Sequence, residues 1–128
     1  MQNPANLDVT HEAMALALLA YRATAKFPAA ERFGLSSQMR RAAVSVGSNI
    51  AEGCGRRGNT ALISFLHTAR GSAGELGFQA EIAAKMELGK AEDLAALAEQ
   101  AARVRRMLAR LIVSLRGRPD RPQQGAPR

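Results

Sequence analysis

The chain has 128 residues and a formal net charge of +7, with 47% hydrophobic and only 4% aromatic residues. This length suits one domain with a single core, and the alanine- and leucine-rich composition favours helices. The single cysteine excludes an internal disulfide, and the apolar run at residues 13–21 is too short to span a bilayer and lacks the basic flank of a signal peptide. We therefore expect a cytoplasmic protein that does not bind membranes.

The first predicted helix begins at Asp8 or Thr10, either of which can cap it, and ends at about Ala25, after a flexible leader at residues 1–7. Its apolar residues form two stripes, which is more than one bundle interior needs. The extra stripe is either a contact surface outside the bundle or an alanine-rich face that water tolerates. The stripes are Met14, Leu18, Tyr21 and Ala25, and Val9, Ala13, Leu16 and Ala20.

A short connection follows the first helix. Pro28 suits the first position of a single helical turn that ends at Glu31. Three large apolar residues, Phe27, Phe33 and Leu35, are expected to anchor this connection in the core.

The second helix is framed by Gly34, which ends the connection, by Ser36 as its expected N-cap, and by Gly53 and Gly55, which stop it. Steps of three and four residues give it one apolar face, formed by Leu35, Met39, Ala42, Val46 and Ile50. A second face carries short hydrogen-bonding side chains where a surface helix normally has Lys and Glu. We interpret this face as stabilising the bundle or its oligomer, with ligand contact as the alternative. It consists of Gln38, Arg41, Ser45, Asn49 and Glu52.

Glu52 has an unfavourable charge for the end of its helix, because C-terminal carbonyl groups disfavour a carboxylate by about 0.3–1 kcal/mol. A cationic partner is therefore expected. The candidates are Arg56, Arg57 and Arg41 of another copy.

Several short motifs around this helix occur together in one known signature. They are Phe27-Pro28, Glu31-Arg32-Phe33-Gly34-Leu35, Ser37-Gln38, Arg40-Arg41-Ala42-Ala43, Ser45, Ser48-Asn49-Ile50-Ala51-Glu52-Gly53, Phe65-Leu66, Gly71-Ser72 and Glu75-Leu76. With these motifs the chain resembles, from about residue 7 to residue 115, the 23S rRNA intervening sequence protein family. That family is related to the accessory variability determinants of diversity-generating retroelements.

The resemblance implies an all-α fold, an antiparallel up-down four-helix bundle that assembles into a homo-oligomer, with a pentamer favoured. It also implies partners, since the retroelement relatives bind a reverse transcriptase and nucleic acid. Gly71 and Glu75 belong to the matching motifs, and we assign them, with the polar face of the second helix, to the bundle or its oligomer.

Residues 54–59 form the sharpest break in the chain, with Asn59 as the expected N-cap of a third helix that ends at Leu88 before Gly89. The Gly-Arg-Arg-Gly loop lacks the strand and the Lys-Ser/Thr ending of a P-loop, so nucleotide binding there is not expected. Arg70 and Glu81 are predicted to point outward. The predicted core face is Leu62, Phe65, Leu66, Ala69, Ala73, Leu76, Ala80 and Ala83.

Gly71, Gly74 and Gly77 lie in the middle of this helix, where each costs about 0.8–1 kcal/mol relative to alanine. They indicate either a bend or a close approach to the helix backbone. We favour a close helix crossing.

The fourth helix is predicted from residues 91–93, with a regular apolar seam of the kind found between antiparallel helices. Residues 116–128 are rich in Gly, Pro, Gln and Arg and are predicted to be a disordered basic tail, so the bundle domain spans residues 8–115. The seam is Leu94, Leu97, Ala101, Val104, Leu108, Leu111 and Leu115.

The whole charge excess lies in residues 103–128, which hold eight arginines and one aspartate, whereas residues 1–102 are balanced. Arginine suits phosphate oxygens, although these arginines can equally form a solvated face and a solubility-enhancing tail. Few aromatic residues are available for base stacking, so we expect phosphate contacts with weak sequence preference. The candidate contacts are Arg56, Arg57, Arg103, Arg106, Arg110, Arg116 and Arg118.

Catalytic groups are scarce, with two histidines and one cysteine. Ser64 and His67 alone cannot form a nucleophilic site, His67 is expected to be partly buried and locally hydrogen-bonded, and no zinc or di-iron ligand spacing is present. We expect no enzyme activity, no metal and no cofactor. Two functions remain: an oligomeric accessory protein that binds nucleic acid, or an adaptor that recruits a protein such as a reverse transcriptase.

Overall fold

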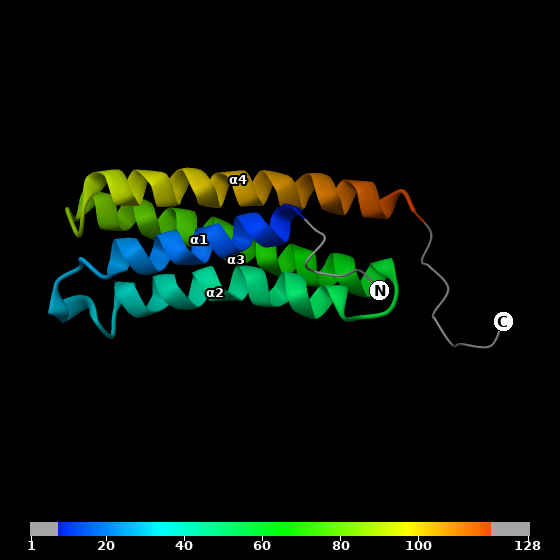
Figure 1. Ribbon diagram of the computed structural model, residues 1–128, viewed down its shortest axis with the longest axis horizontal. Helices are drawn as coiled ribbons and strands as arrows, with labels where there is room; N and C mark the ends of the chain where they lie inside the picture. Colours follow the sequence, from blue (N-terminus) through cyan, green and yellow to red (C-terminus); the bar gives the residue numbers. More distant parts are fainter. Residues whose placement is uncertain (1–7, 119–128) are drawn as a thin grey trace.

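The computed structural model describes residues 8–118, which form four α-helices and one 3₁₀ turn, with no strand among them. The helices are α1 (Asp8–Thr24), α2 (Leu35–Cys54), α3 (Asn59–Lys85) and α4 (Ala91–Arg116), and η2 (Ala29–Glu31) is the 3₁₀ turn. They run alternately up and down (Figure 1), as predicted. The predicted flexible leader and residues 119–128 of the predicted tail lie outside the described residues.

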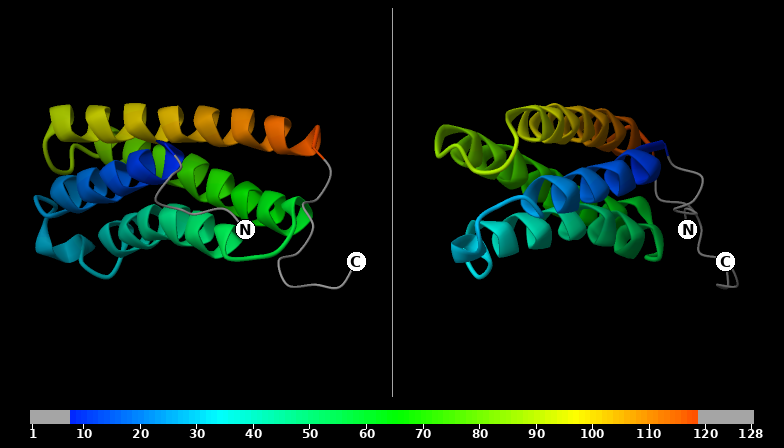
Figure 2. Two further views of the ribbon diagram at one scale, coloured as in Figure 1. Left: turned by 45° about the vertical axis from the view of Figure 1, so that its right-hand side comes forward. Right: turned by 60° about the vertical axis from the view of Figure 1, so that its left-hand side comes forward.

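Each helix packs against two others: α1 and α3 both contact α2 and α4. Two further views show α1 between α4 and α2 (Figure 2). Large apolar side chains from every helix are buried in the centre, and burial of each contributes about 1.5–3 kcal/mol. The largest fully buried ones include Leu16, Met39, Ile50, Leu66, Leu76, Leu97 and Leu108.

The predicted core faces of α2, α3 and α4 are largely confirmed, because most of their residues are buried. Three predicted members are only partly buried: Leu35 of α2, Phe65 of α3 and Leu111 of α4. Near the end of α4, Ile112 is buried instead. A straight helix with 3.6 residues per turn drifts away from a regular seventh-residue repeat, and over the length of α4 this drift shifts the buried line by one residue.

In α1, one of the two predicted apolar stripes is buried and the other is exposed. Val9, Ala13, Leu16 and Ala20 point into the core. On the exposed stripe, 62% of Met14, 62% of Leu18 and 45% of Tyr21 are accessible to solvent. The bundle interior therefore covers one of the two predicted stripes and leaves the other exposed.

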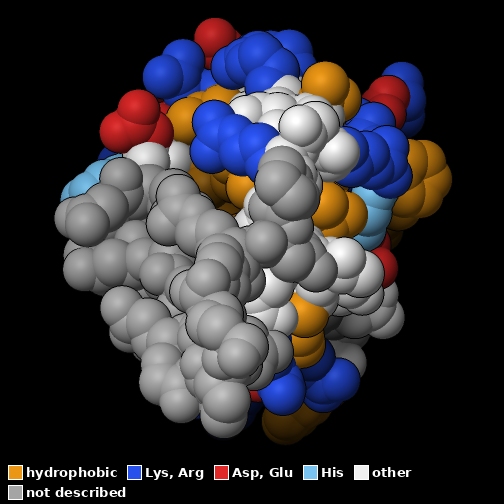
Figure 3. All heavy atoms as spheres, turned by 90° about the vertical axis from the view of Figure 1, so that its right-hand side faces the viewer, with side chains coloured by type: hydrophobic (Ala, Val, Ile, Leu, Met, Phe, Trp, Pro, Cys, Tyr) orange, Lys and Arg blue, Asp and Glu red, His pale blue; other side chains and the backbone are white. Residues whose placement is uncertain are grey.

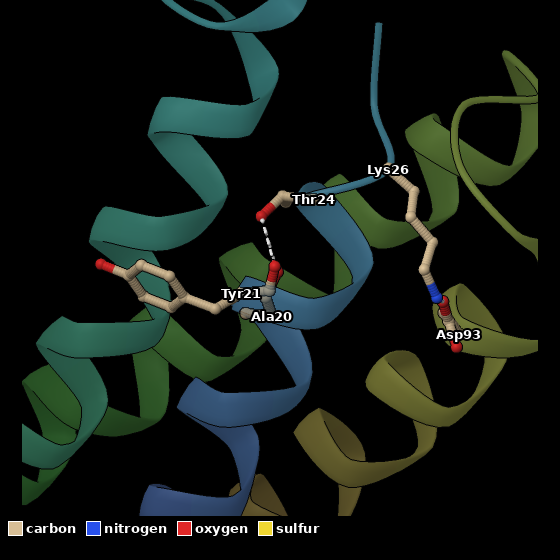
Figure 4. Close-up of polar contacts among 5 residues, drawn as sticks. All are labelled: Ala20, Tyr21, Thr24, Lys26 and Asp93. Carbon is tan, nitrogen blue, oxygen red and sulfur yellow. Dashed lines mark hydrogen bonds and ion pairs between the residues drawn. The ribbon is translucent and has the colours of Figure 1, made fainter.

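Side-chain contacts fix the end of α1. The Thr24 hydroxyl donates to the Ala20 carbonyl at 2.8 Å, and Lys26 Nζ lies 2.7 Å from Asp93 Oδ2 near the start of α4 (Figure 4). The hydrogen bond to Lys26 is the main reason why the pKa of Asp93 is lowered from its ordinary value. The connection that follows is therefore tied to α4.

The connection contains the predicted helical turn after Pro28, but two details of the prediction are wrong. Phe33 is 89% exposed, whereas Phe27 and Leu35 pack against the core. Ser36 is not the N-cap of α2, because the helix begins at Leu35 with Gly34 as the capping residue. Glu31 takes over part of the cap, since its carboxylate accepts the Leu35 N–H at 3.3 Å. A carboxylate just before the helix also complements the positive end of its dipole.

The third helix differs from its predicted bounds at both ends. Gly58 is the residue before it, with a φ of 86°, and Asn59 is its first helical residue rather than its N-cap. The helix ends at Lys85 instead of Leu88 because Glu87 adopts a φ of 56°, and Gly89 follows with a φ of 64°. A left-handed residue ends a right-handed helix, so the chain turns before Gly89.

The predicted close crossing at the α3 glycines is not found. A Cβ on Gly71 would meet nothing within 4 Å, and one on Gly77 would make an ordinary 3.8 Å contact with Ala101. The closest approach involves Gly53 of α2, where a Cβ would lie 2.8 Å from the Phe65 Cβ and 3.0 Å from Leu62 Cδ1. The small residue that brings two helices together is therefore the one at the end of α2.

No helix within residues 8–118 is long and apolar enough to cross a membrane.

Candidate nucleic-acid interface

The α2–α3 loop and the end of α4 lie at the same end of the bundle (Figure 1). Five of the predicted phosphate-binding residues therefore come to this end, and we call them the basic end: Arg56, Arg57, Arg110, Arg116 and Arg118. All five are exposed. Figure 3, which faces this end, shows Lys and Arg side chains around its edge, with acidic and apolar side chains between them.

Arg56 is the partner that Glu52 was predicted to need. Its Nη2 lies 2.7 Å from Glu52 Oε1, and its guanidinium lies 5.3 Å from the centre of the Phe65 ring. Both side chains of the ion pair are more than half exposed. Such surface pairs contribute about 0.2–1 kcal/mol, so Arg56 can exchange this partner for a phosphate at low cost.

Arg116 reaches across from α4 to α3. Its Nη2 lies 2.9 Å from His67 Nε2, and because an arginine only donates, this ring nitrogen is the acceptor of the contact. His67 is exposed, which corrects the expectation that it is partly buried. This contact involves no carboxylate, so it does not compensate the charge of Arg116.

Arg103 is not free for a ligand in the way the sequence suggests. Its Nε donates to Glu12 Oε1 at 3.0 Å, and the same carboxylate oxygen accepts from Gln100 at 2.9 Å. These two hydrogen bonds, that of Gln100 first, lower the pKa of Glu12 from its ordinary value. Arg103 thus joins α4 to α1. Arg106 and Arg110 are exposed on the outer face of α4 and match both predicted interpretations, a phosphate contact or a solvated face.

Sequence reasoning missed a second basic row between α3 and α4. Arg70 and Arg105 line a shallow hollow of about 260 Å³ together with His67, Gly71 and Gly74. Gly74 makes this possible, because a Cβ there would lie 3.4 Å from Arg105 Nε. The three glycines of α3 were the signal in the sequence. Of these, Gly74 leaves space for Arg105 of α4 rather than for a helix backbone.

The predicted polar face of α2 meets α3 of the same chain in its middle. The Ser45 hydroxyl lies 2.9 Å from the Ser72 hydroxyl, and Asn49 Nδ2 donates to the Ser45 carbonyl and hydroxyl at 2.8 and 3.0 Å. These contacts support the interpretation that Ser45 and Asn49 stabilise the bundle.

The other residues that the sequence assigned to the bundle or its oligomer face solvent. Gln38, Arg41, Gly71 and Glu75 are all exposed, and Glu75 accepts a 3.3 Å hydrogen bond from Gln79. The structure of one chain gives these residues no interior role. Contact with another copy or with a ligand stays a prediction for them.

Reactive groups are dispersed in the part of the chain that the structure describes. No three His, Cys, Asp or Glu side chains there come close enough to hold a metal ion. Cys54 is buried, and burial raises the pKa of its thiol. A protonated, inaccessible thiol is a poor nucleophile.

The described residues thus define a class of protein, an all-α up-down four-helix bundle with arginines gathered at one end. A family model matches residues 5–110, and the chain belongs to the 23S rRNA-intervening sequence protein family. The resemblance seen in the sequence is confirmed at this level. Its extension to the accessory variability determinants of retroelements stays a prediction.

The fold is also found in a solved structure. The chain is similar to the crystal structure of a protein of unknown function from the S23 ribosomal protein family of Bacteroides thetaiotaomicron, with 20% sequence identity and a TM-score of 0.75. The match covers 82% of this chain and 95% of that one, and at this identity it shows the fold alone. No curated protein matches the sequence.

Proposed function

We propose that this protein is a non-enzymatic accessory protein that binds nucleic acid through arginine–phosphate contacts at the basic end. The observation that carries the proposal is the gathering of arginines from two distant segments, residues 56–57 and 110–118, at one end of the bundle. Guanidinium groups match phosphate oxygens in geometry and charge, and phosphate contacts need no base-reading motif. The bound nucleic acid should therefore be recognised with weak sequence preference.

Self-association is the second part of the proposal. The exposed stripe of α1, formed by Met14, Leu18 and Tyr21, is a surface that another copy could cover. In a pentamer, five basic ends would act together, and linked weak contacts give far higher overall affinity than single ones. The alternative is that this stripe recruits a different protein, such as a reverse transcriptase, and that the basic charge is incidental.

Fluorescence anisotropy tests the nucleic-acid proposal. A structured RNA and a duplex DNA of equal length are titrated with the full chain over a salt series. On duplex DNA each neutralised phosphate contributes about 0.9 to the slope of log affinity against log salt. We expect a steep slope for the unaltered chain and a smaller slope for the double variant Arg110→Gln, Arg118→Gln.

The matched control removes two charges elsewhere. Arg22→Gln with Lys85→Gln gives the same net charge as the test variant, and both residues are exposed outside the basic end. We expect this control to keep the slope of the unaltered chain. Absence of binding at low salt, or an equal loss in both double variants, would show that the basic end is not the binding surface.

A further inference from the structure

The opposite end of the bundle contains a larger hollow that none of the functions above uses. Here the connection between α1 and α2 lies beside the first turns of α2 and borders an open hollow of about 670 Å³. This volume lies within the range of sites for small ligands. Three arginines line the hollow, Arg32, Arg40 and Arg41, together with two aromatic rings and several hydroxyl groups, and no carboxylate does.

Arg40 is held in place at the wall of this hollow. Its Nε donates to the Thr24 hydroxyl at 2.8 Å, and its guanidinium lies 4.7 Å from the centre of the Tyr21 ring. Figure 4 shows Tyr21 reaching from α1 towards α2. Thr24 is itself fixed by its hydrogen bond to Ala20. One edge of the guanidinium is thereby anchored, and its terminal nitrogens stay available in a fixed orientation, which lowers the entropic cost of binding an anion.

The first turn of α2 adds donors without protein acceptors. Ser36 is only 7% exposed, lines the hollow, and its hydroxyl has no hydrogen-bond partner within residues 8–118. Gly34 has no side chain to cap the helix, and Glu31 accepts only the Leu35 N–H. The backbone N–H groups of Ser36 and Ser37 are left without an acceptor in this part of the chain. These donors open onto the hollow, so an oxygen from water or from a ligand completes their hydrogen bonds.

The acceptor that fits these donors is an anionic oxygen group. The positive end of a helix dipole and three guanidiniums favour negative charge, and phosphate oxygens can take hydrogen bonds from backbone N–H, hydroxyl and guanidinium groups together. Glu31 is the nearby carboxylate, and its bond to the Leu35 N–H directs it to the edge of the helix end.

The aromatic rings indicate what else the ligand carries. Phe33 lines the hollow and is 89% exposed, with Arg32 stacked at 5.3 Å from its ring centre. An exposed phenyl ring next to an anion site is a stacking surface for one flat base, whereas inorganic phosphate or a carboxylate would not use it. We propose that this hollow binds a nucleotide, with its phosphate on Ser36, Arg40 and Arg41 and its base on Phe33.

Such a nucleotide can be free or can be the phosphorylated 5′ end of a nucleic-acid strand. Isothermal titration calorimetry on the full chain separates these sources. The probes are adenosine 5′-monophosphate, adenosine, inorganic phosphate, and a short RNA with either a 5′-phosphate or a 5′-hydroxyl. We expect the monophosphate to bind at least about tenfold more tightly than adenosine or phosphate alone, since both halves of the site then contribute.

A preference of the RNA for its 5′-phosphate form, above the affinity of the monophosphate, assigns the site to strand ends. Binding of the monophosphate alone assigns it to free nucleotides. Both results support the proposal. Absence of binding by the monophosphate, together with equal affinity for the two RNAs, overturns it, because RNA can also bind at the basic end.

Variants locate the binding. Arg41→Gln and Phe33→Ala each alter an exposed side chain, so they should leave the fold intact by circular dichroism and weaken nucleotide binding about tenfold. Arg22→Gln removes the same charge from α1 outside the hollow and should change nothing. The proposal is refuted if Arg41→Gln and Phe33→Ala leave the affinity for the nucleotide unchanged. It is also refuted if these variants change the oligomer mass while the unaltered chain binds no nucleotide.

The basic end provides an independent check. The double variant Arg110→Gln, Arg118→Gln should keep its affinity for adenosine 5′-monophosphate even where it loses affinity for long nucleic acids. Failure of the proposed function at the basic end therefore leaves the nucleotide site standing, and failure of the nucleotide site leaves the basic end standing.

Discussion

Alanine in place of Gly53 and in place of Gly71 should change the stability of the bundle in opposite directions. Both residues lie in helices, where alanine is intrinsically preferred by about 0.8–1 kcal/mol. A Cβ on Gly71 meets nothing within 4 Å, so Gly71→Ala should gain this full amount. For a domain of this size the gain corresponds to a rise of roughly 4 °C in Tm.

At Gly53 steric overlap outweighs propensity. The new Cβ would lie 2.8 Å from the Phe65 Cβ and 3.4 Å from the Leu62 carbonyl oxygen, so α2 and α3 must move apart. Overpacking of this kind costs about 1–3 kcal/mol. Gly53 also lies in the last turn of α2, where the gain from helix propensity is smaller than in the interior. We expect Gly53→Ala to lower the free energy of unfolding by about 1–2 kcal/mol.

Urea unfolding followed by circular dichroism, at one fixed protein concentration, measures both variants. A Gly53→Ala protein as stable as the parent would refute the close approach of α2 to Phe65. A loss of stability in Gly71→Ala, especially with a change of mass by light scattering, would mean that another copy covers Gly71. That second result would also give the Gly71-Ser72 motif an assembly role.

Three further outcomes are expected. Glu12→Gln should make the stability of the fold less dependent on acid. The lowered pKa of Glu12 stabilises the fold above the ordinary glutamate pKa of about 4.3, and this stabilisation is lost as the pH falls through the lowered pKa. Urea unfolding from pH 7 to pH 2 gives stability against pH for the parent and the variant, and parallel curves would contradict this prediction. Leu18→Glu on the exposed stripe of α1 should reduce the mass by light scattering while helix content stays unchanged; an unchanged mass would remove this stripe from assembly. Cys54 should react with a thiol reagent only in urea, because the folded bundle buries it; rapid reaction of the folded protein would show that the end of α2 opens.

Sequence periodicity predicted what depends on one helix at a time. The apolar spacing of Met39, Val46 and Ile50 identified a core face because any partner helix must cover that face. The helix ends near Gly55 and Thr24 followed from local preferences for turns and caps. These features are set by residues within a few positions of each other.

The sequence could not predict features that depend on which helices are neighbours. Arg105 lies out of phase with Arg103, Arg106 and Arg110, and its place beside Gly74 exists only because α3 and α4 are adjacent. The hydrophobicity of Phe33 favoured burial, but the connection is too short to turn its ring back into the core while Phe27 and Leu35 already pack there. The hollow at that end was missed for the same reason, since its walls come from α1, the connection and α2.

The contact of α1 with α4 closes the bundle into a ring in which every helix has its chain neighbours beside it and the last helix lies next to the first. The start of α1 points towards the end of the bundle at which α4 ends (Figure 1), so the order in which the helices follow one another is not unique to this architecture. A circular permutant that links these two ends and opens at the α3–α4 turn would keep the same four helix interfaces. The fold is thus determined by its cycle of packed faces, and the position at which the chain is cut is a separate property.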